Sequence, residues 1–175
     1  MKSKKDIRKL MIQKLKKDNL VNGSVYHRLY TDPFWIHAKV IALTLSTKVE
    51  IDTNPIIKMG IANNKTIVVP KVYPDRQMKF IRLSNQSRFK SDIFGIPEPV
   101  NGKIINKAQI DLVIVPGLAF AINTGDRIGF GGGYYDRYLN QYHGNKIALA
   151  KSFQVFENPL WKINQFDIKV NRIIF

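Results

Sequence analysis

The stretch RIGFGGGYYDRYL, residues 127–139, holds the residues of this chain with the most evident capacity for chemistry. It combines four glycines and three tyrosines with Arg127, Asp136 and Arg137. Glycines leave backbone N–H groups open to a ligand and permit the positive φ that an anion cradle requires. A guanidinium before the glycines and a carboxylate after them offer a phosphate clamp and a magnesium ligand. The spacing therefore predicts a phosphate-binding loop.

Several common catalytic signatures are absent. The chain has no G-x-x-x-x-G-K-[ST] sequence, and Asp136 stands where the dinucleotide fingerprint G-x-G-x-x-G would need its last glycine. Serine hydrolase signatures are missing too. The absence of cysteine excludes disulfides, thiolate metal sites and cysteine nucleophiles. The histidines lack metal-ligand spacing and are interpreted as structural: His27, His37 and His143.

The net charge predicts an anionic partner without identifying it. The chain has 28 Lys and Arg against 13 Asp and Glu, a formal charge of +15. Such a field concentrates anions near the surface, so nucleic acid, nucleotide phosphates, polyanionic cofactors and anionic membranes all fit, as does a surface charged for solubility. The charged N-terminus lacks the apolar core of a secretory signal, and no apolar run reaches membrane-spanning length. We expect a cytoplasmic protein.

A basic amphipathic helix is predicted over the first seventeen residues. Apolar residues recur at i, i+3, i+4 and i+8 from Ile7, which is helical spacing. Lys4 and Arg8 fall on or beside the apolar stripe, where half-burial of a cation favours an anionic partner. Other basic residues point away and form a solvated face: Lys5, Lys9 and Lys16.

The remaining pattern predicts an α/β fold. Apolar runs predict strands over 40–46, 66–69, 78–83, 110–115, 146–153 and 169–175. A helix capped by Asp52 or Thr53 should run to about Asn63, and 26–35 shows a weak helical pattern. The glycine stretch should join the buried strand 110–115 to a tyrosine-rich helix. We expect one domain over 1–175, with a largely parallel sheet flanked by helices on both faces.

The longest motifs identify a family resemblance. IDLVIVPGLAF followed by DRIGFGGGYYDRYL resembles the signature of the 5-formyltetrahydrofolate cyclo-ligase family, also called 5,10-methenyltetrahydrofolate synthetase. Further fragments resemble the family in order along nearly the whole chain: KKDIRKLM, LSTKVEIDT, VVPKV, MKF, GIPEP and DIKVNRIIF.

The resemblance implies an enzyme that uses Mg²⁺ and ATP to convert 5-formyltetrahydrofolate into 5,10-methenyltetrahydrofolate, with release of ADP and phosphate. The formyl oxygen would attack the γ-phosphate, and N10 would then close the ring as phosphate leaves. This chemistry calls mainly for positioning and charge neutralisation. The implied partners are ATP and the folate, with or without a polyglutamate tail, and neither nucleic acid nor membrane. The protein would be a monomer or weak homodimer.

The resemblance also implies roles for single residues. Arg127 and Tyr135 would be catalytic, and Asp136 and Asp167 would hold magnesium. ATP would be bound by Lys4, Lys5, Arg8, Arg127, Ile128, Gly129, Phe130, Gly131, Gly132, Gly133, Tyr134 and Tyr135. The folate would be bound by Leu45, Glu50, Phe130, Gly131, Gly132, Gly133 and Tyr134.

Two positions depart from the family pattern, and two other functions stay open. Ala121 and Asn171 stand where the family usually has aspartate, and we expect neither departure to abolish function. A basic nucleic-acid or phosphate-binding module without catalysis is compatible with the charge and the tyrosines. A phosphosugar isomerase of related architecture would need no ATP.

Overall fold

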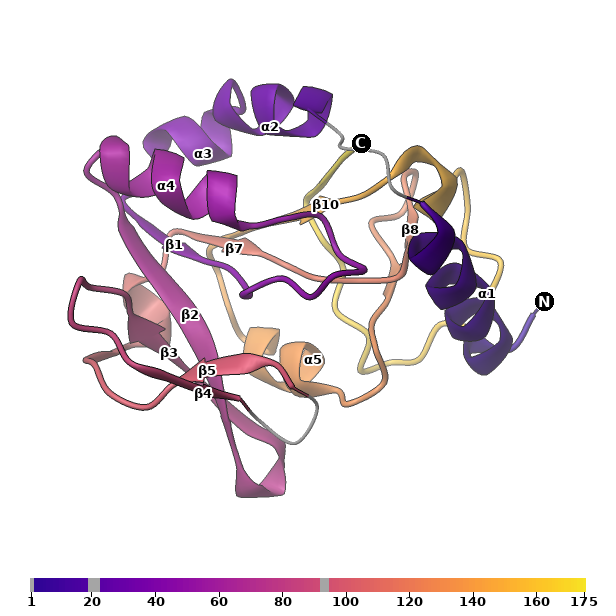
Figure 1. Cartoon of the computed structure of the whole chain (residues 1–175). Helices are drawn as coiled ribbons and strands as arrows, with labels where there is room; N and C mark the ends of the chain where they lie inside the picture. Colours follow the sequence, from indigo (N-terminus) through magenta and orange to yellow (C-terminus); the bar gives the residue numbers. More distant parts are fainter. Residues whose placement is uncertain (1, 19–22, 92–94) are drawn as a thin grey trace.

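A seven-stranded mixed sheet forms the centre of the fold in the computed structural model, which describes residues 2–18, 23–91 and 95–175 (Figure 1). The strand order is β12-β10-β7-β1-β2-β3-β6. The first five of these strands are parallel, and β3 and β6 each pair antiparallel with their neighbour. The strands are β1 (Val40–Ala42), β2 (Thr66–Tyr73), β3 (Gln77–Arg82), β6 (Ile104–Ile105), β7 (Leu112–Ile114), β10 (Asn145–Leu149) and β12 (Arg172–Ile174).

Alternate residues of the central strands point to opposite faces of the sheet and pack into two separate hydrophobic clusters. Ile41 and Ile67 pack with the helices on one face, while Ala42 and Val68 pack with α5 on the other. The first face is covered by α2 (Gly23–Tyr30), α3 (Pro33–His37) and α4 (Asn54–Ala62), and the second by α5 (Tyr134–Leu139) (Figure 1). Burial on both faces explains why these strands are continuously apolar. The predicted α/β fold with helices on both faces is confirmed.

A smaller sheet and the N-terminal helix form a third cluster. The sheet has the order β11 (Val155–Phe156), β8 (Ala119–Ala121), β9 (Arg127–Ile128). Against it packs α1 (Lys4–Lys17), which buries Ile7, Met11 and Leu15 as its spacing predicts. The glycine stretch follows β9 of this small sheet, so the prediction that it directly follows β7 was wrong. Between β7 and the glycine stretch, β8 and β9 form a hairpin. Their sequences are too short and too weakly periodic to predict these strands.

The other elements are short. A two-stranded ribbon is formed by β4 (Phe89–Ser91) and β5 (Pro97–Pro99), and single 3₁₀ turns occupy Pro74–Arg76, Lys107–Gln109 and Ser152–Gln154. Among the described residues, no helix combines the length and the apolar composition that crossing a membrane demands.

Several predicted boundaries moved. The strand predicted over 40–46 ends at Ala42, and the one predicted over 146–153 ends at Leu149. The strand predicted to stop before Pro70 continues to Tyr73. Because β1 pairs with β2 only as far as Val68, Pro70 lies where β2 has β3 as its pairing partner, and a proline is tolerated there.

Gly125 closes the turn between β8 and β9, and its replacement by alanine should destabilise the fold. Its φ is +73°, and an added Cβ would overlap the backbone carbonyl oxygen of Val170. Gly125→Ala should lower the free energy of unfolding by more than about 2 kcal/mol. Gly23→Ala is the matched control, because no atom lies within 4 Å of its added Cβ. Urea unfolding of both variants measures the difference, and equal midpoints would contradict the argument.

Candidate active site

The glycine loop, residues 129–133, connects the small sheet to α5. Gly131 and Gly133 have φ of 110° and 70°, values that side chains rarely accept. The helix that follows is only six residues long. Its dipole is therefore small, so the start of this helix by itself offers little attraction for an anion. Anion affinity at this loop must come mainly from its amides and from nearby cations.

Arg127 lies buried beneath this loop. Only 3% of its side chain is exposed, and its Nη2 atom pairs with Asp136 Oδ1 at 2.9 Å. Its Nη1 atom donates to the carbonyl oxygen of Pro116 at 3.3 Å, at the carboxyl end of β7. Burial lowers the pKa of Arg127, while the negative charges of Asp136 and Asp167 act against that shift. A guanidinium stays charged under these conditions, so Arg127 is a fixed buried cation.

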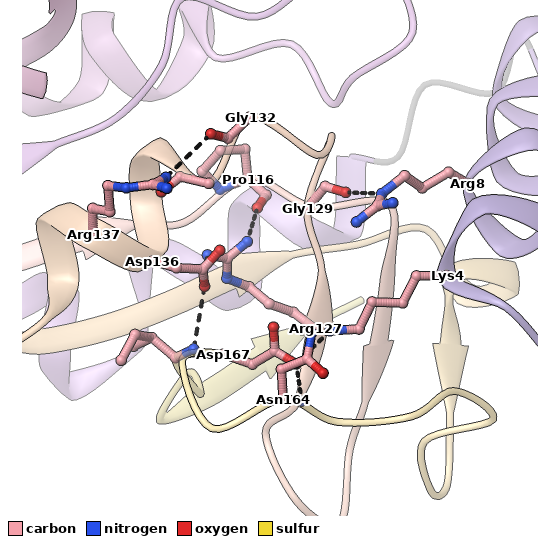
Figure 2. Close-up of polar contacts among 12 residues, drawn as sticks. Lys4, Arg8, Pro116, Arg127, Gly129, Gly132, Asp136, Arg137, Asn164 and Asp167 are labelled. Atoms are coloured by element: carbon pink, nitrogen blue, oxygen red, sulfur yellow. Dashed lines mark hydrogen bonds and ion pairs between the residues drawn. The ribbon is translucent and has the colours of Figure 1, made fainter. Parts of the chain in front are cut away.

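Two carboxylates flank this cation from different parts of the chain (Figure 2). Asp136 Oδ1 also accepts a hydrogen bond from the backbone N–H of Ile168 at 3.2 Å. Asp167 Oδ2 accepts one from the Asn164 N–H at 2.8 Å and forms an ion pair with Lys4. The loop around Asp167 thus contacts both Lys4 of α1 and Asp136 at the start of α5.

Arg8 reaches the glycine loop from α1. Its Nε atom donates to the carbonyl oxygen of Gly129 at 2.9 Å. Its guanidinium carbon would lie 3.7 Å from a Cβ added at Gly131, an ordinary van der Waals contact, so this arginine packs against the loop there. Lys4 and Arg8 are both partly buried, whereas Lys5 is exposed on the same helix. The structure therefore brings Lys4 and Arg8, but not Lys5, into contact with the other predicted site residues.

Tyr135 and Glu50 are two further predicted site residues, and they interact electrostatically. The Tyr135 hydroxyl is buried and has no hydrogen-bond partner among the described residues. Burial raises the pKa of Tyr135, and the charge of Glu50 raises it further, so the hydroxyl is protonated. Glu50 Oε2 accepts hydrogen bonds from the N–H and Oγ1 of Thr47 at 2.9 and 2.8 Å. Glu50 also lines a small pocket with Pro116, and no residue of the glycine loop contributes to that lining.

The remaining predicted residues differ in how much surface they present. Phe130 is 47% exposed, so it is available to a ligand. Tyr134 is partly buried against the core and would touch any side chain added at Gly132. Ile128 is buried against α1, and Leu45 is half-buried in the loop between β1 and α4.

Three groups around the site were not predicted. The carbonyl oxygen of Pro116 and the N–H of Asn164 hold Arg127 and Asp167, and backbone groups leave no sequence signal. Arg137 donates to the carbonyl oxygens of Gly132 and Gly133. The sequence shows that Arg137 lies four residues after Gly133, but only the loop conformation shows which carbonyl oxygens it contacts.

Known proteins share this architecture. The chain superposes with a TM-score of 0.82 on the NMR structure of Aquifex aeolicus 5,10-methenyltetrahydrofolate synthetase, at 32% identity over 98% of this chain and 88% of the other. It superposes with a TM-score of 0.75 on a Mycoplasma pneumoniae 5,10-methenyltetrahydrofolate synthetase, at 26% identity over 99% and 98% of the chains. The Haemophilus influenzae 5-formyltetrahydrofolate cyclo-ligase is 32% identical over 76% of each chain.

The fold, the buried-cation site and these likenesses place the chain in the class of α/β ligases. More narrowly, it belongs to the 5-formyltetrahydrofolate cyclo-ligase family, whose model matches residues 1–175. The family resemblance seen in the sequence is confirmed.

Proposed function

We propose that this protein converts 5-formyltetrahydrofolate into 5,10-methenyltetrahydrofolate with consumption of ATP and Mg²⁺ and release of ADP and phosphate. Family membership supports the overall activity. The observation that supports the ATP chemistry is the buried Arg127, held by Asp136 and Pro116 beside a loop of glycine residues. A fixed guanidinium away from water stabilises developing negative charge far better than a mobile surface cation.

ATP phosphates would lie along the glycine loop between Arg127 and α1. Arg8 uses Nε to hold Gly129, and its terminal nitrogens face the loop near Gly131. Lys4, now paired with Asp167, would turn its ammonium group toward phosphate. The loop amides would complete the cradle, because a glycine carries no side chain that would keep a phosphate oxygen away.

Asp136 and Asp167 fit a magnesium ion that keeps several ligands from water and phosphate. Both carboxylates lie near Arg127, and no larger group of His, Cys, Asp or Glu suited to a metal occurs in the described part of the chain. Two carboxylates suit Mg²⁺ in a nucleotide site. Held by these two carboxylates, Mg²⁺ would neutralise part of the charge of the phosphates. Asn171, a departure from the family, instead accepts a hydrogen bond from Lys146 N–H, which ties β12 to β10.

In the reaction, the formyl oxygen of the folate would attack the γ-phosphate and form a phosphorylated imidate while ADP departs. N10 would then add to the activated carbon, and the C–O bond would break to release phosphate. The ring closes easily because phosphate is a far better leaving group than an amide oxygen. Arg127 would stabilise the charge on the transferred group, and the protonated Tyr135 hydroxyl would donate a hydrogen bond to it.

The folate would bind where Glu50 faces the pocket beside Pro116. A carboxylate can accept paired N–H bonds from the amino-pyrimidinone edge of a pterin. Leu45 and the exposed ring of Phe130 would supply apolar surface.

The direct test mixes the purified protein with Mg-ATP and 5-formyltetrahydrofolate and follows the absorbance of the methenyl product. We expect product only when nucleotide, metal and folate are all present. A flat trace from folded protein would disprove the proposal. Turnover without ATP would contradict the proposed use of the nucleotide.

The nucleic-acid alternative loses its support from the tyrosines. Tyr134, Tyr135 and Tyr138 pack against the core on the α5 face, and Tyr142 is itself buried there. Base stacking requires exposed rings, whereas the rings of these four tyrosines pack in the hydrophobic core.

Arg8→Ala should weaken ATP binding. The change removes a cation beside the loop and the donor that holds Gly129, so we expect the KM for ATP to rise about tenfold. The KM for 5-formyltetrahydrofolate should change by less than about twofold. Lys9→Ala is the control, since Lys9 is an exposed cation on the same helix. An ATP KM equal to that of the control would make Arg8 purely structural.

A further inference from the structure

Arg137 is an exposed arginine that meets the glycine loop without facing its phosphate side. Its Nη1 atom donates to the carbonyl oxygen of Gly133 at 3.1 Å and to that of Gly132 at 3.4 Å. Figure 2 shows it reaching the loop from α5, on the side opposite to Arg8. The guanidinium of Arg137 is thus engaged with the backbone of the loop.

One of these contacts bears on the direction of a loop amide, because the Gly133 carbonyl oxygen also accepts the backbone N–H of Arg137 at 3.2 Å in the first turn of α5. In a trans peptide the C=O and N–H groups point in opposite directions. When the Arg137 side chain holds the Gly132 carbonyl oxygen, the N–H group of Gly133 must point away from Arg137. Peptides between glycines otherwise rotate freely, and a flipped peptide would present a carbonyl oxygen to the phosphate.

The conformation of Gly133 makes the contact possible. Its φ is 70°, and an added Cβ would lie 2.5 Å from the Nη1 atom of Arg137. Any larger residue at 133 would displace the guanidinium as well as strain the backbone.

We propose that Arg137 is a positioning residue for ATP: its guanidinium holds the Gly132 carbonyl oxygen outward, so that the following amide of Gly133 faces the phosphates. The inference rests on the proposed ATP-dependent function. Arg137 acts through the loop and touches neither substrate. Its loss should therefore weaken nucleotide binding more than folate binding.

The test compares Arg137→Ala, Arg137→Lys and the exposed-cation control Lys9→Ala in steady-state kinetics. Arg137→Ala should raise the KM for ATP about tenfold and leave the folate KM within about twofold. Arg137→Lys should recover part of the loss, because an ammonium group can donate to the same carbonyl oxygens. If Arg137→Ala and Lys9→Ala give the same ATP KM, the inference is overturned.

A spectroscopic readout separates positioning from general stability. In wild-type protein, titration with ADP and Mg²⁺ should shift the backbone amide signal of Gly133. Arg137→Ala should lose this shift with an unchanged thermal midpoint, and a persistent shift would overturn the inference. If the alanine variant does not fold, Arg137→Gln, which keeps a polar side chain, undergoes the same comparison. Absence of wild-type turnover would disprove the proposed function, whereas an active wild type with an indifferent Arg137 would disprove only this inference.

Discussion

Arg127→Met is expected to reduce kcat/KM by about 10²- to 10³-fold, the cost typical of removing one preorganised donor from a transition state. Methionine fills the buried space with an uncharged chain, so the loss should come from charge and not from packing. Asp136, which is 28% exposed, keeps its hydrogen bond from Ile168 and can be hydrated. We therefore expect a folded protein with little turnover.

Arg127→Lys is the matched variant for this prediction. Lysine keeps the positive charge but cannot contact Asp136 and the Pro116 carbonyl oxygen with separate nitrogens in a fixed plane. Activity should fall between that of the wild type and that of Arg127→Met. Single-turnover formation of the methenyl product measures both variants. Activity of Arg127→Met within threefold of wild type would remove Arg127 from the proposed chemistry.

Asp136→Asn should impair both activity and stability. The asparagine keeps an acceptor for the Ile168 N–H but leaves the buried Arg127 without its charged partner. Breaking a fully buried ion pair costs about 3–5 kcal/mol, and partial exposure of Asp136 should reduce this to about 1–3 kcal/mol. Turnover should fall about 100-fold, because the substitution removes a carboxylate of the proposed metal site. The contact with Arg127 is the reason that we expect stability to fall together with turnover.

Asp167→Asn is the matched variant for Asp136→Asn, because it separates the loss of turnover from the loss of stability. Asp167 pairs with Lys4, whose side chain is partly exposed, so its replacement leaves no deeply buried charge unpaired. We expect a similar loss of turnover with a smaller loss of stability. Chemical unfolding and the methenyl assay, done at several magnesium concentrations, measure both quantities. Full activity of Asp136→Asn at low magnesium would contradict the proposed metal role.

The local pattern of the sequence determined the elements that bury a regular face. The stripe of Ile7, Met11 and Leu15 predicted α1 and set Lys4 and Arg8 apart from the outward lysines. The run over 110–115 predicted a strand buried on both sides, as β7 is. These predictions succeeded because helical and strand periodicities act between residues close in sequence.

The composition of residues 127–139 also predicted a ligand loop, and the motifs identified the family. Glycine content and flanking charge are properties of the chain itself, so they could be interpreted without coordinates. These properties did not predict which of the residues contact one another.

Only the tertiary structure decided how the site is assembled. The pairing of Lys4 with Asp167 joins residues 163 positions apart, and the hairpin of β8 and β9 carries Arg127 to the Pro116 carbonyl oxygen. The contact of Arg137 with the carbonyl oxygens of Gly132 and Gly133 depends on the loop conformation, whereas a list of residue types shows this arginine only as another surface cation. Such contacts depend on how separate elements pack, and their sequence separation leaves no periodic signal. The sequence therefore specified the chemical groups, and packing of the two sheets determined which of them meet.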